Sequence, residues 1–303
     1  MRFASLAALG ATLLLCVPAL AQETFTYSYG DYTAELPMNP KRVFVMDSRT
    51  GLDFAVSAGL PIVATDWDAD VGSHFDKDVP ASADRLKFRS EPNAELALSY
   101  DPDLLVVGSG WWKYWQDQAL FAAGDLPVLV VQDGIGDSWR QIFLDQMVAF
   151  GRTDEANTLL AQYDAAVADA KPKIAATLKG RKVAILDVWA ADTMALQVDT
   201  FSTAIAKELG IDLVTGDDSV VAEDGYKLYS PETLGVLDDA ALVMSLWSAD
   251  MAANPMWQRV PAIAAGAQYE MDIANTWGFA LTATDLVGDV MEAIAVLEKA
   301  DAQ

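Results

Sequence analysis

The sequence predicts an α/β protein of two Rossmann-like lobes, joined by one long spanning helix, with a ligand cleft between the lobes. Three observations support this fold class. Apolar, strand-like runs alternate with helical stretches, a pattern typical of a mostly parallel sheet covered by helices. The alternation occurs twice, in two halves of similar plan, and a single long amphipathic stretch separates the halves. The chain has 303 residues, 52% of them hydrophobic, which is enough to bury two cores.

The first residues predict export. Residues 1–21 have a basic start, an apolar run too short to span a bilayer and a small-residue end, the layout of a signal peptide cleaved before Gln22. Cys16 is the only cysteine, and Leu15 precedes it where lipid attachment requires a small residue. We therefore expect a cleaved, secreted protein that is not a lipoprotein and has no disulfides.

The first lobe is expected over residues 22–150. It begins with alternating, hairpin-like strands at residues 25–36 and ends in a helix at residues 138–150. Its other expected strands are residues 42–47, 61–64, 104–107 and 128–131.

Residues 151–178 are expected to form the spanning helix, because Ala156, Tyr163 and Val167 recur on one helical face. Some 20 to 25 helical residues reach roughly 30–38 Å, enough to cross from one lobe to the other. Pro172 is expected to kink or end this helix.

The second lobe is expected over residues 179–303, with strands at 182–187, 211–214 and 241–244 and a last helix at 284–299. A strand, a helix and a second strand open each lobe, which is the basis of the predicted repeat. A single helical connection between lobes predicts limited hinge motion.

Charge and composition exclude several functions. A formal net charge of −24 argues against nucleic acid and anionic membrane surfaces as partners. His74 is the only histidine, which excludes a multi-histidine metal site. We find no Gly-x-Ser-x-Gly elbow and no P-loop, so no catalytic residue is proposed. The 44 acidic residues leave glycosidase-like chemistry open.

Aromatic residues follow several expected strands, where loops that face a cleft begin. Residues 111–115 contain five consecutive bulky side chains, and such a loop cannot be buried entirely. The alternative for any single tryptophan is that it fills the interior. The candidate ligand contacts of this kind are Trp111, Trp112, Tyr114, Trp189, Trp247 and Trp277.

Three cations alternate with hydrophobic residues at Arg85, Lys87 and Arg89, so an extended strand would place them on one face. Such a group in an acidic protein suggests an acidic or oxygen-rich ligand. The alternative is a solvated edge strand. Arg89 is the strongest candidate, since it lies nearest the start of the next helix.

One glutamate in each half lies two residues after a helix-capping residue: Glu95 after Asn93, and Glu232 after Ser230. A carboxylate in a first helical turn is explained by the helix dipole alone. Two such carboxylates on two lobes could also pair with two arginines of a partner protein.

These residues resemble the solute-binding proteins of iron-siderophore, haem and vitamin B12 import systems, a family with two Rossmann-like lobes and one backbone helix. The resemblance lies in the order and spacing of several short motifs. The motifs are residues 40–43, 91–95, 101–105 and 255–262.

The likeness is greatest to ferric hydroxamate-binding proteins. In that family an arginine before a Ser-Glu-Pro-Asn turn contacts iron-bound oxygens, which implies this role for Arg89. The family's aromatic ligand contacts imply the same for Tyr114, Trp277 and, with a different aromatic, Tyr226. The resemblance further implies that the ligand is a ferric chelate whose iron is held by the chelator, with no intrinsic cofactor and no metal bound by protein side chains.

The resemblance also implies a partner and a location. The family docks on an ABC permease in the inner membrane through one glutamate per lobe, which implies Glu95 and Glu232. We expect a periplasmic monomer that functions in iron transport.

Three alternatives remain open from the sequence. Haem or cobalamin transport would use the same fold, and with haem as the ligand Tyr114 or His74 would occupy the open iron site. Arg85 and Lys87 would suit an anionic catecholate or carboxylate siderophore better than a near-neutral hydroxamate. The alternative of another class is a secreted carbohydrate-active enzyme or sugar-binding module.

Overall fold

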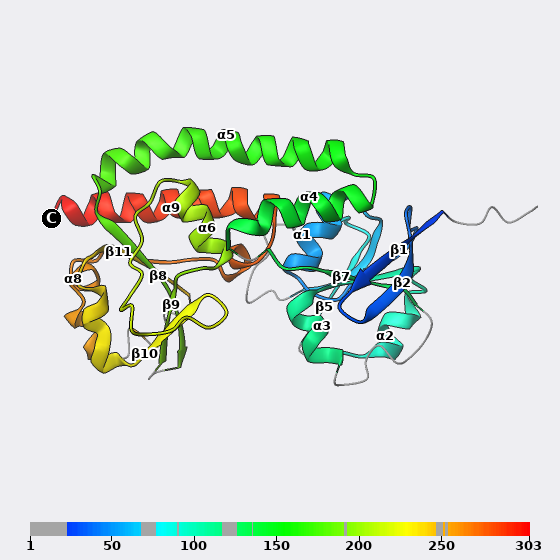
Figure 1. Cartoon of the computed structure of the whole chain (residues 1–303), viewed down its shortest axis with the longest axis horizontal. Coiled ribbons are helices and arrows are strands. Elements are labelled where there is room, and N and C mark those ends of the chain that lie inside the picture. Colours follow the sequence, from blue (N-terminus) through cyan, green and yellow to red (C-terminus); the bar gives the residue numbers. More distant parts are fainter. Residues whose placement is uncertain are drawn as a thin grey trace, which may run out of the picture.

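The computed structural model describes residues 23–67, 77–89, 91–116, 126–134, 136–190, 193–246, 251 and 254–303. It contains two lobes, each built on a five-stranded sheet, and α5 (Thr153–Leu178) runs along both of them (Figure 1). The predicted fold class is confirmed. The expected signal peptide, His74 and Trp247 lie outside the described residues. No helix within the described ranges is both long and apolar enough to cross a membrane.

The sheet of the N-terminal lobe is entirely parallel, in the order β5-β4-β3-β6-β7. The chain starts at the central strand β3, winds outward to one edge, and returns to the other side at β6. Ligands of such sheets bind outside the carboxyl ends of the strands where the winding reverses, here β3 and β6. The strands are β3 (Val43–Val45), β4 (Ile62–Asp66), β5 (Asp84–Leu86), β6 (Leu104–Gly108) and β7 (Val128–Val131).

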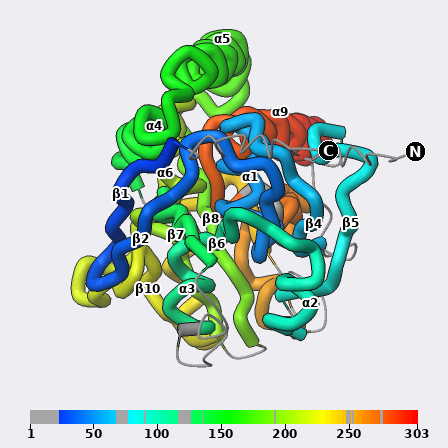
Figure 2. The backbone as a smooth tube through the Cα atoms, turned by 90° about the vertical axis from the view of Figure 1, so that its right-hand side faces the viewer, coloured from blue at the N-terminus to red at the C-terminus, as the bar shows by residue number. Residues whose placement is uncertain are grey.

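The helices described in this lobe are α1 (Thr50–Ser57), α2 (Ala94–Ser99), α3 (Ser109–Gln116) and α4 (Trp139–Ala149). A short 3₁₀ turn, η2 (Gly136–Ser138), precedes α4. The predicted hairpin is also confirmed, as β1 (Thr24–Tyr29) and β2 (Tyr32–Pro37). It lies at the β7 edge of the lobe, opposite β5 (Figure 2). There the Tyr32 hydroxyl accepts a hydrogen bond from the Val128 N–H at 2.9 Å, and the Tyr27 hydroxyl donates to the Val130 carbonyl.

The sheet of the C-terminal lobe has the order β10-β9-β8-β11-β12, with β9 antiparallel to both of its neighbours. Its strands are β8 (Lys182–Ala190), β9 (Thr193–Gln197), β10 (Tyr226–Tyr229), β11 (Ala240–Leu246) and β12 (Gln268–Glu270). Its helical segments are α6 (Phe201–Glu208), η3 (Pro231–Leu237), η4 (Pro255–Arg259), α8 (Pro261–Ala264), η5 (Ile273–Thr276) and α9 (Ala280–Asp301).

The predicted strand at 211–214 is reduced to a single parallel bridge between Leu213 and Val183, flanked by backbone hydrogen bonds of Asp212 and Val214 to Val183. The short connection after β8 brings β9 back as the antiparallel neighbour of the second half of β8, so only the beginning of β8 is left to pair with the predicted strand. The plan of the first lobe is therefore repeated only in part.

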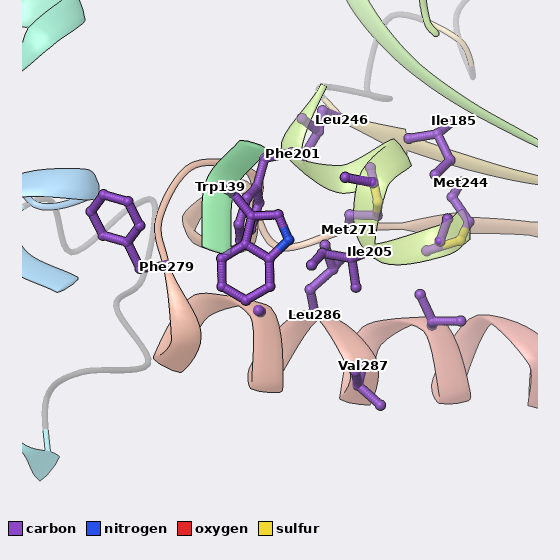
Figure 3. Close-up of a cluster of buried hydrophobic side chains, with 14 of the residues drawn as sticks. Trp139, Ile185, Phe201, Ile205, Met244, Leu246, Met271, Phe279, Leu286 and Val287 are labelled. Atoms are coloured by element: carbon purple, nitrogen blue, oxygen red, sulfur yellow. The ribbon is translucent and has the colours of Figure 1, made fainter. Parts of the chain in front are cut away.

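The helix α5 continues through Pro172 and ends at Leu178, where Lys179 adopts a left-handed conformation with φ of 53°. Its buried face, which includes Tyr163, Val167 and Ile174, packs on α9. One hydrophobic core continues from lobe to lobe beneath these helices. In Figure 3, Trp139 of α4 lies beside Phe201 of α6, with ring centroids 5.6 Å apart. This shared core favours small lobe movements.

Candidate functional site

A cavity of about 620 Å³ lies at the carboxyl ends of the central strands of the N-terminal lobe and is closed by the turn before α9. Its volume is typical of a site for a small molecule. The residues that line it are Asp47, Arg49, Thr50, Arg89, Gly110, Trp111, Tyr114, Asp133 and Trp277. Four predicted contacts are thus brought together: Arg89, Trp111, Tyr114 and Trp277.

Asp47 forms the floor where β3 ends. Its side chain is 1% exposed and accepts hydrogen bonds from the backbone N–H groups of Gly108 at 2.6 Å, Gly51 at 3.1 Å and Arg49 at 3.1 Å. Burial raises the pKa of Asp47 to about 6, although these hydrogen bonds oppose the shift, and the nearby Asp133 raises it further. A Cβ on Gly51 would lie 2.3 Å from the Asp47 carboxylate, so this close approach requires glycine.

Asp133 is the second carboxylate of the cavity. It accepts hydrogen bonds from the Ser109 hydroxyl at 2.6 Å and the Gly110 N–H at 3.0 Å, at the beginning of α3. The carboxylate therefore fixes the start of the helix that presents the aromatic wall.

Arg89 and Trp111 form one wall. The guanidinium carbon lies 5.4 Å from the centroid of the Trp111 ring, and the backbone N–H of Arg89 donates to Oδ1 of Asp66 at 2.6 Å. Trp111 also contacts Tyr114 edge to face, with centroids 6.0 Å apart. Tyr114 is 59% exposed, so its ring is available to a ligand.

Trp112 does not belong to this wall. The predicted loop at 111–115 is part of helix α3, and helical spacing places Trp111 and Tyr114 on the cavity face. Trp112 and Trp115 face the core instead. Trp112 is 5% exposed and packs on Tyr32 at a centroid distance of 4.9 Å. The structure therefore contradicts the assignment of Trp112 as a ligand contact.

Arg85 also lies elsewhere. Its guanidinium carbon is 4.9 Å from the centroid of the Trp67 ring, and Arg85 is not among the cavity-lining residues. The strand β5 ends at Leu86, so the alternation expected from Arg85 to Arg89 does not continue as one extended face. The structure does not support Arg85 as a ligand contact.

Arg49 and Trp277 close the cavity across the two lobes. Arg49 precedes α1, Trp277 lies in the turn before α9, and the guanidinium carbon is 4.5 Å from the ring centroid. Sequence reasoning missed Arg49, Asp47 and Asp133. Their signal was their position directly after strands of an expected parallel sheet, where ligand-binding loops begin.

A second aromatic group lies at the end of β8. The rings of Trp189 and Tyr226 have centroids 5.3 Å apart, and Trp189 is 49% exposed. Asp187 beneath them is 1% exposed and accepts a hydrogen bond from Gln197 at 2.6 Å. Burial raises the pKa of Asp187 to about 6, while hydrogen bonds and the charge of Arg49 oppose the shift. Arg49, which lines the first cavity, therefore also interacts electrostatically with Asp187 of this second group.

Glu95 and Glu232 lie on the surface, one on each lobe. Glu95 is in the first turn of α2, where the Asn93 side chain accepts a hydrogen bond from the Leu96 N–H at 3.0 Å. Glu232 is in the first turn of η3, and a hydrogen bond from Ser230 lowers its pKa. Both helical segments lie on the side of the molecule away from α5 (Figure 1).

Two α/β lobes, one spanning helix and a charged, aromatic cavity that both lobes line define a class of solute-binding proteins. The model of the family described as periplasmic binding protein matches residues 43–273, and the chain belongs to this family. The family consists of transport components rather than enzymes.

Two relatives come from Bacillus subtilis (strain 168). The probable siderophore-binding lipoprotein YfiY is 21% identical over 274 residues, which cover 84% of this chain and 82% of the relative. The Fe(3+)-citrate-binding protein YfmC is 27% identical over 248 residues, covering 78% of this chain and 75% of the relative. The crystal structure of the triscatecholate siderophore-binding protein FeuA from Bacillus subtilis, complexed with ferri-bacillibactin, shares the fold. Its TM-score is 0.69 at 18% identity, over 89% of this chain and 98% of that one.

Proposed function

We propose that this protein is the periplasmic solute-binding component of an ABC importer that binds a ferric siderophore in the cavity and delivers it without chemical turnover. The observation that carries the proposal is the pairing of Arg89 with Trp111 inside the cavity. A guanidinium donates charge-assisted hydrogen bonds to iron-ligating oxygens, and aromatic faces pack on the organic shell of a chelator. The family match and the siderophore-binding and Fe(3+)-citrate-binding relatives support the same function.

The charges of the cavity favour a hydroxamate-type siderophore. Arg49 and Arg89 face two carboxylates, Asp47 and Asp133, in the same cavity. Formal charges of this lining cancel when both carboxylates are ionised, which suits a near-neutral chelate better than a strongly anionic one. The argument for an anionic siderophore depended partly on Arg85, which lies over Trp67 instead.

In this proposal the chelator supplies the coordination sphere of iron. Among the described residues, no group of three His, Cys, Asp or Glu side chains is placed to hold a metal ion. The side chains of the cavity then recognise the outside of the complex.

Glu95 and Glu232 are proposed to dock the permease. Each is exposed and lies in the first turn of a helical segment, and the two helical segments lie on the side of the molecule away from α5. Two carboxylates on two lobes can pair with two basic residues of a permease, and both pairs form together only when the lobes are suitably placed relative to each other.

Titration of the tryptophan fluorescence tests the ligand assignment. The ligands are a ferric trihydroxamate, a ferric triscatecholate, ferric citrate, haem and cobalamin. We expect saturable one-to-one quenching by the trihydroxamate, with affinity at least about tenfold lower in Arg89→Ala. Arg85→Ala is the matched control, because it removes an arginine stacked on a tryptophan outside the cavity. No response to any of the five ligands, or equal losses in the two variants, would refute the assignment.

A further inference from the structure

Asp53 is a buried carboxylate of the N-terminal lobe whose hydrogen bonds mostly cross to the other lobe. It lies in α1, and its side chain is 0% exposed. One oxygen, Oδ2, accepts from the Phe279 N–H at 2.7 Å, the Thr282 N–H at 3.1 Å and the Thr282 hydroxyl at 2.6 Å. The other oxygen accepts from the Ser57 hydroxyl at 3.0 Å.

The three donors belong to the beginning of α9. The first N–H groups of a helix have no partner within the helix, and a side chain at the N-cap position usually satisfies some of them. The N-cap residue here is Phe279, which makes no such side-chain hydrogen bond. Asp53 provides this cap from the opposite lobe, and its negative charge favours the positive end of the α9 dipole. In Figure 3, Phe279 projects from the start of α9 toward α1.

The same contact fixes the turn that holds Trp277. A Cβ on Gly278 would lie 2.0 Å from the Thr282 hydroxyl oxygen and 2.7 Å from Oδ2 of Asp53, so this turn approaches Asp53 too closely for any side chain. Trp277 comes immediately before Gly278 and lines the cavity. Arg49, which stacks on Trp277, comes immediately before α1. One short helix thus supplies both the cation over the ring and the carboxylate that secures its turn.

We infer that Asp53 is a positioning residue for ligand binding: by capping α9 from the N-terminal lobe, it holds Trp277 beneath Arg49 in the cavity. The ligand-binding part of this inference rests on the proposed function, whereas the contact that holds the two lobes together is independent of it. A buried carboxylate is costly unless its hydrogen bonds are satisfied, and four donors satisfy Asp53.

A double-mutant cycle tests the positioning role, with the ferric trihydroxamate as ligand. We expect Asp53→Ala to weaken binding roughly tenfold, and less than about twofold when Trp277→Ala is already present. Asp53→Asn should retain most of the affinity, because its amide oxygen can still accept from α9. Equal losses in both backgrounds would show a general effect on folding and overturn the inference, as would unchanged binding by Asp53→Ala.

A second measurement needs no ligand. Nitroxide labels at Glu95→Cys and Glu232→Cys, in the protein without the expected signal peptide and its Cys16, report the distance between lobes. We expect Asp53→Ala to broaden the distance distribution and the exposed control Asp239→Asn to leave it unchanged. An unchanged distribution in Asp53→Ala would overturn the inference.

If Asp53→Ala does not fold, Thr282→Val replaces it in both experiments under the same criteria, since it removes one donor to Asp53. If the native protein binds none of the ligands, the proposed function is refuted. If Asp53→Ala still broadens the distance distribution in that case, the contact between lobes is supported independently.

Discussion

Arg49 and Trp277 form a cation–π pair across the two lobes, with the guanidinium carbon 4.5 Å from the ring centroid. The positive charge of Arg49 also opposes the rise that burial causes in the pKa of Asp187 on the C-terminal lobe. One arginine of the N-terminal lobe therefore interacts with two segments of the other lobe at the edge of the cavity.

Replacement of Arg49 is expected to weaken ligand binding. Arg49→Gln removes a cavity cation and a cation–π pair that contributes about 0.5–2 kcal/mol, so we expect an affinity loss of about tenfold. The affinity of Arg49→Lys should lie between those of the native protein and Arg49→Gln, because lysine keeps the charge but not the planar stacking. Calorimetric titration measures both, and Arg85→Gln serves as the control. Native affinity in Arg49→Gln would contradict the role.

Stability is expected to fall as pH rises from about 4 to about 6. Burial raises the pKa of Asp47 to about 6, so the folded protein binds this proton more tightly than the unfolded chain does. A shift of about two units corresponds to about 3 kcal/mol that is present at low pH and lost above pH 6. Asp187, with a pKa also raised to about 6, acts in the same direction. Urea unfolding at pH 4.5 and 7.5 measures the difference, which should shrink in Asp47→Asn. An identical pH dependence in that variant would exclude Asp47 as the source.

Two neighbouring tryptophans should respond oppositely to truncation. Trp112→Ala opens a hole beside Tyr32 in the core, and we expect a loss of about 3–5 kcal/mol in the free energy of unfolding. Trp111→Ala removes a cavity wall and should chiefly lower ligand affinity. Thermal unfolding and fluorescence titration of both variants separate the two effects. A larger stability loss in Trp111→Ala would show that the helical phase of α3 is misassigned.

The docking proposal separates binding from transport. The double variant Glu95→Ala with Glu232→Ala should bind the chelate with native affinity and fail to support uptake, because the cavity is intact and the permease contacts are lost. Uptake of radioactive iron by cells that depend on this importer measures transport. The control is Asp31→Ala with Asp218→Ala, which removes one exposed carboxylate from each half of the chain. Normal uptake by the glutamate double variant would exclude docking through these residues.

Periodic patterns in the sequence predicted much of the fold. The long helix could be predicted because apolar residues recur on one face through Val167 and beyond. The strand expected at 128–131 coincides with β7. The segment 211–214 looks equally strand-like, but its pairing depends on which segment reaches the side of β8. Local sequence does not contain that information.

The candidate site was predictable in part for the same reason. Arg89, Trp111, Tyr114 and Trp277 were found because residue type and position after a strand indicate exposure to a cleft. Trp112 was misassigned because residues 111–115 were expected to form a loop, whereas they belong to helix α3, which turns Trp112 toward the core. Arg49 was missed because its importance comes from Trp277, which lies far along the chain and reaches it only through the fold.

The hairpin at the start of the described chain has a consequence for the order of folding. Tyr27 and Tyr32 bond to backbone groups of β7 that are 103 and 96 residues further along. In a chain that crosses a membrane from its N-terminus, the hairpin emerges first but cannot dock until β7 has followed. The unpaired edge of β7 is exposed until then, and an exposed strand edge is a template for association with other chains. In such a chain, the docking of the hairpin therefore waits for a strand about 100 residues later in the sequence.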